Sequence, residues 1–359
     1  MKPELIYITS SRSSFVEVDL AILSKHYNLT VSIYPWKKKW LLPFLMFRQV
    51  GFLLLRSFSV RLIMISSAGY WSLVPVLFGK LRSIPVCIIL NGSDCASLPR
   101  INYGNLRKPL LKNVCRKSLE LADFLLPVSE SLVTTENTYD SRKIIDKQGY
   151  QHFFPEIKTG YQVIFNGLDS RYWKSENPAN KEKNSFISVF SASQYILKGG
   201  DLIVEIAGRF PECTFYMAGI KQPPDGTEVS SNIRFLGRLT PSELLEYYRR
   251  CQFHFQLSIF EGFGCTLCEA MLCECIPLGS AVNIIPMIIG DTGLILEHRD
   301  ADLLEALINR ALAMQNKQES GLNARRRIIG NFSLENRERQ LTSVVESRIN
   351  PALPVSSNS

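Results

Sequence analysis

Short apolar runs rich in β-branched and aromatic residues recur along the whole chain of 359 residues, and segments with helical spacing separate most of them. Runs that are apolar at nearly every position are typical of strands buried on both faces. Alternation of such strands with helices predicts parallel sheets covered by helices on each side. The predicted strands are residues 5–9, 30–34, 62–66, 86–91, 124–128 and 163–165, followed by 186–191, 214–218, 233–236, 253–257, 276–279 and 294–296.

A polar segment, 169–185, divides these runs into two sets, because it contains Pro178 and lacks apolar periodicity. The predicted fold class is α/β, with two doubly wound Rossmann-like domains facing a cleft. The predicted divisions are a first domain at 1–168, a second at 169–335, a C-terminal helix at 336–350 that packs back on the first domain, and a flexible tail at 351–359. Doubly wound sheets bind ligands at the carboxyl ends of their strands.

Two helix starts are predicted from local chemistry. Thr240-Pro241-Ser242-Glu243 has a Thr N-cap, Pro at the first helical position and Glu at the third, which is a complete capping box. Asp300 similarly precedes a helix that runs to Met314. Helical spacing also predicts helices at 15–26, 106–122, 201–210 and 241–250.

Positive charge is concentrated in the first third of the chain. The whole sequence has 41 Lys and Arg against 33 Asp and Glu, a net charge of +8, whereas residues 1–120 hold 17 basic and 5 acidic residues. Between Asp19 and Asp94 there is no carboxylate, while nine basic residues occur. The first domain is therefore expected to meet an anionic partner, which could be nucleic acid, a lipid head group or a phosphorylated substrate.

Nine cysteines, an odd number placed inside apolar runs, and the absence of a recognisable signal peptide predict reduced thiols in a cytoplasmic protein. Four of them fall within eleven residues, but zinc sites normally use two pairs about a dozen or more residues apart. These four are therefore predicted to be buried small hydrophobes, and we expect no metal and no cofactor. The longest apolar stretch, 41–55, is interrupted and too short to span a membrane.

The segment 260–271 follows a predicted strand and opens a helix. Gly262 and Gly264 permit a tight turn and a close backbone approach, and the helix start favours a phosphate group above it. Two carboxylates, Glu261 and Glu269, bracket the turn and are suited to accept hydrogen bonds from sugar hydroxyls. An alternative is that Thr266 and Glu269 form a capping box and Glu269 only satisfies a backbone N–H.

The stretch from 232 to 296 closely resembles the C-terminal domain of family 4 retaining glycosyltransferases, also described as glycosyl transferases group 1, which have the two-Rossmann (GT-B) architecture. The segments that carry the resemblance are 232–238, 261–271 with its two glutamates, 275–280 and 289–293, and weaker matches extend it to 91–94, 127–130, 166–169 and 198–201.

The resemblance implies a role for each matched residue. Glu261 would contact hydroxyls of the donor sugar, and Lys198 would neutralise the diphosphate leaving group, although a loop lysine is often only solvated. Glu269 would contact the nucleotide ribose. The remaining donor-side residues are Gly262, Phe263, Gly264, Thr266, Leu267 and Arg238.

The sequence departs from the family pattern at three places. The Arg usually found about five residues before the Lys is replaced in the segment that contains Ser193, and the first-domain His is Asn91. The two-glycine loop expected near residue 283 reads Asn283-Ile284. Either another cation supplies the second positive charge or the diphosphate is held more weakly. Proton transfer through position 91 is lost, and sugar selectivity is left open.

In resembling enzymes the first domain takes the acceptor, often a membrane-anchored lipid-linked sugar. The acceptor-side residues expected here lie on the loops after two predicted strands, and they are Arg12, Ser13, Ser14, Asn91 and Asp94.

Lys37, Lys38 and Lys39 stand between two tryptophans and precede the apolar stretch. Basic residues beside aromatic and apolar ones are typical of a membrane-surface element. The alternative is a core helix with a solvated lysine cap. Nucleic acid ranks low because the chain has no recognised nucleic-acid module.

The sequence therefore predicts a metal-independent hexosyltransferase that moves a sugar, with retention, from a nucleotide-diphosphate sugar to a saccharide or lipid-linked acceptor, in bacterial surface polysaccharide assembly. The expected location is the cytoplasm, peripheral on the inner face of the cytoplasmic membrane. The alternatives are a same-fold nucleotide-sugar epimerase and a non-catalytic nucleotide-sugar-binding protein.

Overall fold

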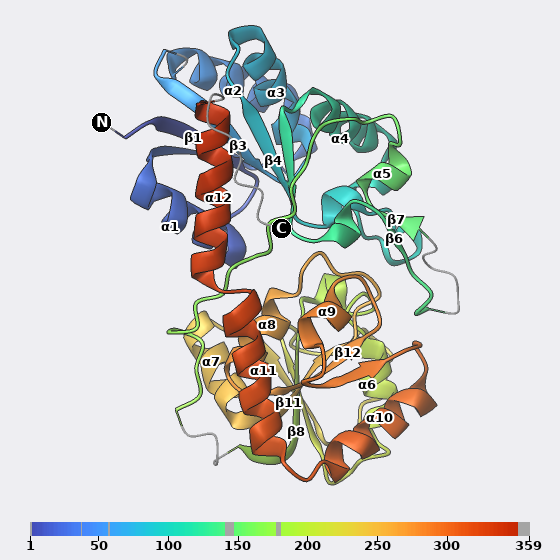
Figure 1. Ribbon diagram of the computed structural model, residues 1–359. Coiled ribbons are helices and arrows are strands. Elements are labelled where there is room, and N and C mark those ends of the chain that lie inside the picture. The colour runs from blue at the N-terminus through green and yellow to red at the C-terminus, as the bar shows by residue number, and fades with distance from the viewer. Residues whose placement is uncertain (1, 37, 57, 141–146, 177–180, 351–359) are drawn as a thin grey trace. The chain divides into compact units, whose positions relative to one another are not determined.

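The computed structural model describes residues 2–36, 38–56, 58–140, 147–176 and 181–350, and these residues form two compact units (Figure 1). The first unit contains the residues up to Thr135, Lys147–Gly167 and the chain from Glu335. The second contains Leu168–Leu334 and also residues 136–140. The expected first domain, 1–168, differs here because Asn137 donates to the Ile259 carbonyl at 2.8 Å and Arg299 N–H donates to the Tyr139 carbonyl at 2.8 Å. The predicted tail, 351–359, lies outside the described residues.

The first unit is built on a five-stranded parallel sheet in the order β2-β1-β3-β4-β5. The strands are β1 (Glu4–Thr9), β2 (Asn28–Ile33), β3 (Val60–Ser66), β4 (Val86–Leu90) and β5 (Phe124–Pro127). A short two-stranded sheet, β6 (Thr135–Glu136) and β7 (Lys147–Gln148), follows. The order changes direction between β1 and β3, which is the point where doubly wound sheets bind ligands.

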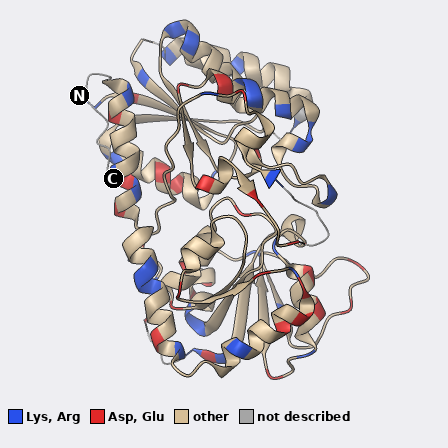
Figure 2. Cartoon of the chain, turned by 45° about the vertical axis from the view of Figure 1, so that its right-hand side comes forward, with Lys and Arg blue, Asp and Glu red and all other residues tan. Residues whose placement is uncertain are grey.

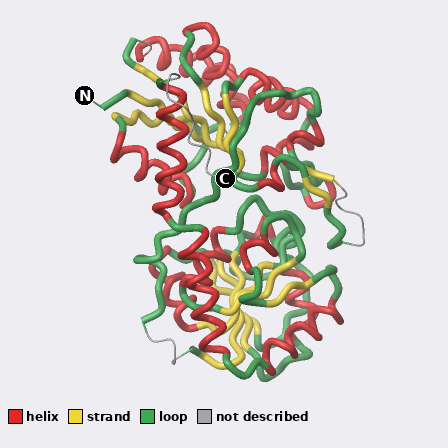
Figure 3. Tube along the Cα trace, in the orientation of Figure 1, coloured by secondary structure: helices red, strands yellow, loops and turns green. Residues whose placement is uncertain are grey.

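Helices cover both faces of this sheet (Figure 3). Right-handed crossovers from β2 to β5 place α2, α3 and α4 on one face, where they pack side by side, and α1 on the other. The helices of the unit are α1 (Ser14–His26), α2 (Leu42–Arg56), α3 (Tyr70–Arg82), α4 (Pro109–Leu121), α5 (Tyr150–Phe153) and α12 (Leu334–Ile349), with short 3-10 turns between them. No helix in the described ranges has the length and apolarity needed to cross a bilayer.

The second unit has a six-stranded parallel sheet in the order β10-β9-β8-β11-β12-β13. Its strands are β8 (Glu182–Val189), β9 (Thr214–Ala218), β10 (Ile233–Gly237), β11 (Cys251–Gln256), β12 (Ile276–Ser280) and β13 (Leu294–Leu296). Its helices are α6 (Gly200–Ala207), α7 (Pro241–Arg250), α8 (Cys265–Leu272), α9 (Ile285–Ile289), α10 (Ala301–Ala313) and α11 (Lys317–Asn331). This strand order is that of a Rossmann sheet, whose direction changes between the first and fourth strands, here β8 and β11.

The predicted α/β class with two doubly wound units is confirmed, and so are both predicted helix starts. Thr240 Oγ1 accepts from Glu243 N–H at 3.3 Å, and the Glu243 carboxylate accepts from Thr240 N–H at 2.7 Å. Asp300 accepts from the N–H groups of Asp302 and Leu303. The predicted strand at 163–165 is not regular: it runs beside β5, with Ile164 N–H donating to the Pro127 carbonyl, and the isolated bridge to β5 lies just before it, at Tyr161.

The C-terminal helix α12 is anchored to the first unit by a buried ion pair. Arg337 meets the Asp19 carboxylate of α1 through Nε at 2.6 Å and Nη2 at 2.8 Å, and both side chains are almost completely inaccessible. Arg337 Nη1 also donates to the carbonyls of Ile164 and Phe165, and Tyr7 OH donates to Asp19 at 3.2 Å. A charge buried this deeply is tolerated because its partner and hydrogen bonds are all present.

Removal of one member of this pair should therefore cost far more than loss of an exposed pair on the same helix. We expect Arg337→Ala to lower the free energy of unfolding by about 3–5 kcal/mol, because it leaves the Asp19 charge buried and uncompensated. The matched control is Lys25→Ala, which removes the partly exposed Lys25–Glu338 pair and should cost about 0–1 kcal/mol. Urea unfolding measures both.

Adding Asp19→Asn to the Arg337→Ala variant should recover part of the loss, because the orphaned charge is then neutralised. Equal destabilisation by Arg337→Ala and Lys25→Ala would show that the buried pair does not anchor α12.

Candidate functional site

The carboxyl ends of β8 and β11 bring Lys198 and Glu261 together, although 63 residues separate them in the sequence. Gly199, next to Lys198, has φ of +73°, and a Cβ there would lie 2.7 Å from the Leu257 carbonyl oxygen. The glycine thus allows the loop after β8 to approach the loop after β11 closely. Ile259 N–H also donates to the Leu197 carbonyl at 2.8 Å, which fixes the two loops to each other.

Lys198 Nζ and the Glu261 carboxylate form an ion pair, with side chains that are only 13% and 11% exposed. The interpretation of Lys198 as a solvated loop residue is therefore wrong. The same Glu261 oxygen accepts from Gln256 Nε2 at 2.6 Å and from Ser258 Oγ at 3.2 Å. Three donors converge on one carboxylate oxygen, so the cluster has a fixed geometry before any ligand binds.

Gln256 connects this cluster to the next helix. Its amide oxygen accepts from Thr266 Oγ1 at 3.2 Å, at the start of α8, and lies 3.3 Å from His254 Nε2. His254 is completely buried, and burial lowers the pKa of its imidazole to about 4. It is therefore neutral at physiological pH and supports the network as a hydrogen-bonding group, without adding charge.

Helix α8 begins at Cys265 after Gly264, whose φ of +100° requires glycine. Gly264 has no side chain to cap the first-turn N–H groups, including those of Thr266 and Leu267. Uncapped N–H groups and the helix dipole make this end a favourable place for an anion. Gly262 and Phe263 are buried in the same loop, and the Phe263 ring packs edge-on to Phe332 at 5.6 Å.

Glu269 is the fifth residue of α8, and its carboxyl group makes no hydrogen bond with any described residue. The capping-box interpretation is therefore wrong, because the N-cap is Gly264 and Thr266 is already inside the helix. Burial raises the pKa of Glu269 to about 8. A buried acceptor without a protein partner is suited to hydroxyl groups that arrive with a ligand.

Asn283, at the position of the expected glycine loop, adopts a left-handed conformation with φ of +52°. Asn tolerates this conformation better than most residues. Its Oδ1 accepts from the backbone N–H of Glu261 at 3.0 Å, so this departure from the family pattern supports the loop that carries Glu261.

The replacement of the usual Arg leaves the site with less positive charge. Ser193 lies in an exposed 3-10 turn (Ala192–Gln194), where a Ser191–Gln194 capping box replaces a cation. Arg238 is exposed after β10, and two strand spacings place it roughly 10 Å from the end of β8. Of the basic side chains in the described ranges, Lys198 is the one hydrogen-bonded to Glu261.

In the first unit, the expected acceptor-side residues follow β1 and β4. Arg12 forms an exposed ion pair with Glu17, and Ser14 begins α1. The Ser13 hydroxyl is buried and has no partner among the described residues. Asn91 Nδ2 donates to the hydroxyls of Ser66 and Ser67 at the end of β3, which lies beside the change of strand direction.

Asp94 differs from this expectation. It is fully buried, and its carboxylate accepts from the backbone N–H groups of Ala68, Asn91 and Gly92 at 2.9, 3.2 and 2.9 Å. Both oxygens are used to shape the loops after β3 and β4. The Asp94 carboxylate therefore holds the backbone of the loop that carries Asn91.

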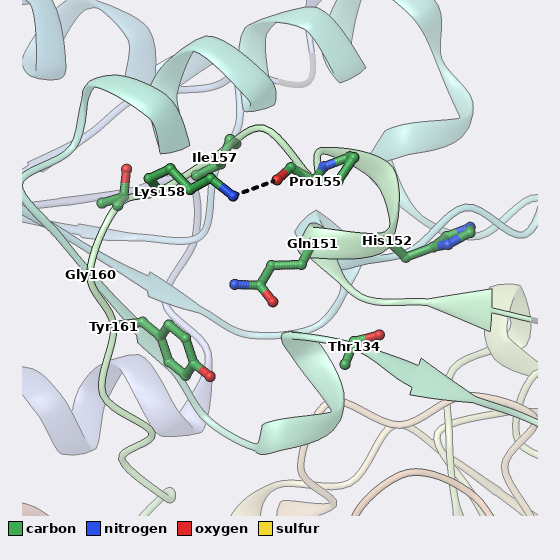
Figure 4. A pocket seen from close by; sticks show the side chains of 9 residues that line it. Thr134, Gln151, His152, Pro155, Ile157, Lys158, Gly160 and Tyr161 are labelled. Carbon is green, nitrogen blue, oxygen red and sulfur yellow. Dashed lines mark hydrogen bonds between the residues drawn. The ribbon is translucent and has the colours of Figure 1, made fainter.

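A separate hollow of about 620 Å³ lies on the first unit near α5 (Figure 4). Gln151 and Tyr161 line it, and Lys158 bends back to donate to the Pro155 carbonyl at 3.4 Å. None of the residues predicted from the sequence lines this hollow, so it is distinct from the candidate site.

All nine cysteines are free, and all except Cys265 are buried. Of the four clustered cysteines, Cys265 is partly exposed, whereas Cys268, Cys273 and Cys275 are buried as predicted, and the last two belong to the apolar cluster around Tyr248. Burial raises the pKa of these thiols. In the part of the chain that the structure describes, no group of three or more His, Cys, Asp or Glu side chains could hold a metal ion.

Two doubly wound Rossmann-like units in one chain define the GT-B fold, and comparison with solved structures agrees. Sucrose-phosphate synthase from Thermosynechococcus elongatus matches with a TM-score of 0.73 and 15% identity, over 98% of this chain and 100% of that one. HepE of Anabaena, solved in complex with UDP-glucose, matches with a TM-score of 0.72 and 14% identity, over 96% and 99%.

Residues 169–328, which lie in the second unit, match the family model described as Glycosyl transferases group 1. The O-antigen chain mannosyltransferase B of Escherichia coli is 34% identical over 80 residues, which are 22% of this chain and 21% of that protein. The serotype-specific mannosyltransferase WbdA of Escherichia coli is 29% identical over 122 residues, 31% of this chain and 14% of that protein. The chain thus spans about one fifth or less of these two relatives.

The raised pKa of Glu269 predicts a pH-dependent cost to the fold. The folded-state pKa of about 8 lies above the ordinary carboxyl value of 4.5, so ionising this group destabilises the ligand-free protein progressively as pH rises from about 4.5 to 8. We expect Glu269→Gln to have a higher Tm than wild type at pH 8, because its free energy of unfolding rises by on the order of 4 kcal/mol at most. The difference at pH 5 should be much smaller.

Thermal melts of the two proteins at both pH values test this. A difference in Tm that is the same at pH 5 and pH 8 would contradict the assignment of a raised pKa to Glu269.

Proposed function

We propose that the protein is a glycosyltransferase that takes a sugar from a nucleotide-diphosphate donor held by the second unit. The observation that carries the proposal is the cluster of Lys198, Glu261 and the uncapped start of α8 at the point where the second sheet changes direction. The match of residues 169–328 to the group 1 family model supports it.

Binding of the donor would break the Lys198–Glu261 ion pair and replace it with contacts to the donor. The diphosphate would take Lys198 away from Glu261 and accept from first-turn N–H groups of α8, while the sugar hydroxyls would donate to the released Glu261 carboxylate. As the sugar–phosphate bond breaks, negative charge grows on the diphosphate, and a fixed cation with a helix N-terminus stabilises that charge. The ribose hydroxyls would donate to the buried Glu269, which also favours its ionised form.

The proposal extends to the stereochemistry of the transfer and to its metal requirement. We infer transfer with retention and without a metal ion, based on the resemblance of 232–296 to retaining enzymes. Catalysis would then depend on stabilising the leaving group and positioning the reactants.

The acceptor would bind to the first unit, on the loops after β1 and β4, where Ser13 and Asn91 present polar atoms that have no protein partner among the described residues. A saccharide or lipid-linked saccharide in the assembly of a surface polysaccharide fits this proposal. The two mannosyltransferase relatives make a mannosyl donor the first to test.

A donor screen by thermal shift tests the donor site. We expect one of the UDP-, GDP-, ADP- or dTDP-sugars, mannosyl donors among them, to raise the Tm of wild type, because it binds only the folded protein. Lys198→Ala should weaken this binding at least tenfold, since it removes the cation that meets the diphosphate. Lys183→Ala is the matched control, an exposed lysine at the amino end of the same strand, β8, and should bind like wild type.

The screen also separates the alternative functions. Turnover of the donor that requires a saccharide acceptor supports transfer, whereas acceptor-free interconversion of the sugar would indicate an epimerase. Binding without any turnover would indicate a binding protein. If no nucleotide sugar stabilises the protein, or if Lys198→Ala and Lys183→Ala bind equally well, the assigned site is wrong.

A further inference from the structure

Helix α2 exposes a continuous apolar stripe on the side that faces away from the sheet. Trp40, Phe44, Phe47, Leu54 and Phe58 follow one another at helical spacing along α2 and its flanks, and their exposed fractions range from 53% to 92%. The opposite side of the helix packs inward through three buried residues, Leu45, Gln49 and Leu53. The helix therefore has two apolar sides, one in the core and one in contact with solvent.

Helix α3 extends this stripe. α2 and α3 pack against each other, and Leu77 and Leu81, one helical turn apart on α3, are 51% and 80% exposed. The guanidinium carbon of Arg82 lies 5.7 Å from the centroid of the Phe58 ring, so the end of α3 meets the residues after α2. We call the whole surface the α2–α3 face; its members are Trp40, Phe44, Phe47, Leu54, Leu55, Phe58, Leu77 and Leu81.

The second unit has no comparable surface among its described residues. Its exposed large apolar side chains are single residues on separate elements, such as Met287 on α9, Leu303 on α10 and Ile329 on α11. Isolated exposed apolar residues are normal, whereas a contiguous patch marks an interaction surface.

The charged side chains on α2, α3 and the residues that flank them are all basic. Arg48, Arg56 and Arg82 are exposed on the two helices, and Lys38 precedes them. Between Asp19 and Asp94 the sequence has no carboxylate at all. Figure 2 shows the Lys and Arg segments on the helices of the first unit.

We propose that the α2–α3 face docks on an anionic lipid surface, with α2 lying in the plane of the interface. Bulky aromatic and leucine side chains would enter the boundary between head groups and acyl chains, and the arginines would meet the phosphates around them. A tryptophan at one end of the stripe suits the interface, because its ring has an apolar body and a polar N–H.

The same charges argue against a second copy of this chain as the partner. In a two-fold dimer the same surface meets itself, so Arg48, Arg56 and Arg82 would face their own copies with no carboxylate from 20–93 to compensate. Like charges brought together in this way are unfavourable.

The structure indicates that the apolar α2–α3 face, more than the three lysines, would bind the lipid surface. Of the three lysines expected at a membrane surface, Lys37 lies outside the described residues, Lys38 is exposed and Lys39 begins a 3-10 turn. Lysines alone would give weak, salt-sensitive attraction, whereas buried aromatic area adds a component that salt does not screen. Docking would bring the first unit to a lipid-linked acceptor, and this one consequence rests on the proposed function.

Flotation with lipid vesicles tests the proposal, using the full chain without nucleotide. We expect wild type to float with vesicles of phosphatidylcholine and phosphatidylglycerol, and to bind vesicles of phosphatidylcholine alone much less. The double variant Phe47→Ser, Leu55→Ser should lower the bound fraction at least tenfold. The matched control, Met287→Ser with Leu303→Ser, removes two exposed apolar residues of the second unit and should float like wild type.

Two further measurements keep the result clear. The variant on α2 should retain the wild-type Tm and its shift with nucleotide sugar, so that loss of flotation is separate from any failure of the donor site. Arg56→Glu with Arg82→Glu should also reduce flotation, by weakening attraction to phosphatidylglycerol. Equal flotation of wild type and the α2 variant would overturn the proposal. Concentration-dependent dimerisation that the same variant abolishes would overturn it too, by assigning the face to a second copy.

Discussion

Every strand pair in the two large sheets is parallel, and this constraint places all the functional loops of a unit at one edge of its sheet. In the second sheet the change of direction between β8 and β11 leaves the two following loops next to each other. Lys198 and Glu261 meet for this reason, and Gly199 allows the approach. The ion pair is therefore a product of topology as much as of the two residues.

The site keeps polar groups in costly positions that only a ligand would relieve. Glu269 is buried without a described partner, and the start of α8 has no side-chain cap. Natural proteins retain such local costs where function needs them. By contrast, Arg337 is hydrogen-bonded both to the Asp19 carboxylate and to two backbone carbonyls of the first unit. This buried pair therefore fits a role in holding α12.

The sequence predicted most of the strands and the helix starts at Thr240 and Asp300, because periodicity and capping are local signals. It also predicted Lys198 and Glu261 as functional residues from their motifs. It did not identify Gln256, a polar residue in an apolar strand, as the partner of Glu261, since that contact depends on how the loops after β11 fold back. The buried position of Asp94 and the membership of 136–140 in the second unit likewise depend on tertiary contacts. For α2, apolar residues on all sides concealed which of them face solvent.

The central claim is that Lys198 and Glu261 form the donor site, and a crystal structure with a bound nucleotide-diphosphate sugar tests it most directly. The account predicts a diphosphate within hydrogen-bond distance of Lys198 Nζ and of N–H groups in the first turn of α8, with the Lys198–Glu261 pair broken and a sugar hydroxyl donating to Glu261. A nucleotide sugar bound elsewhere, with that ion pair intact, would contradict it.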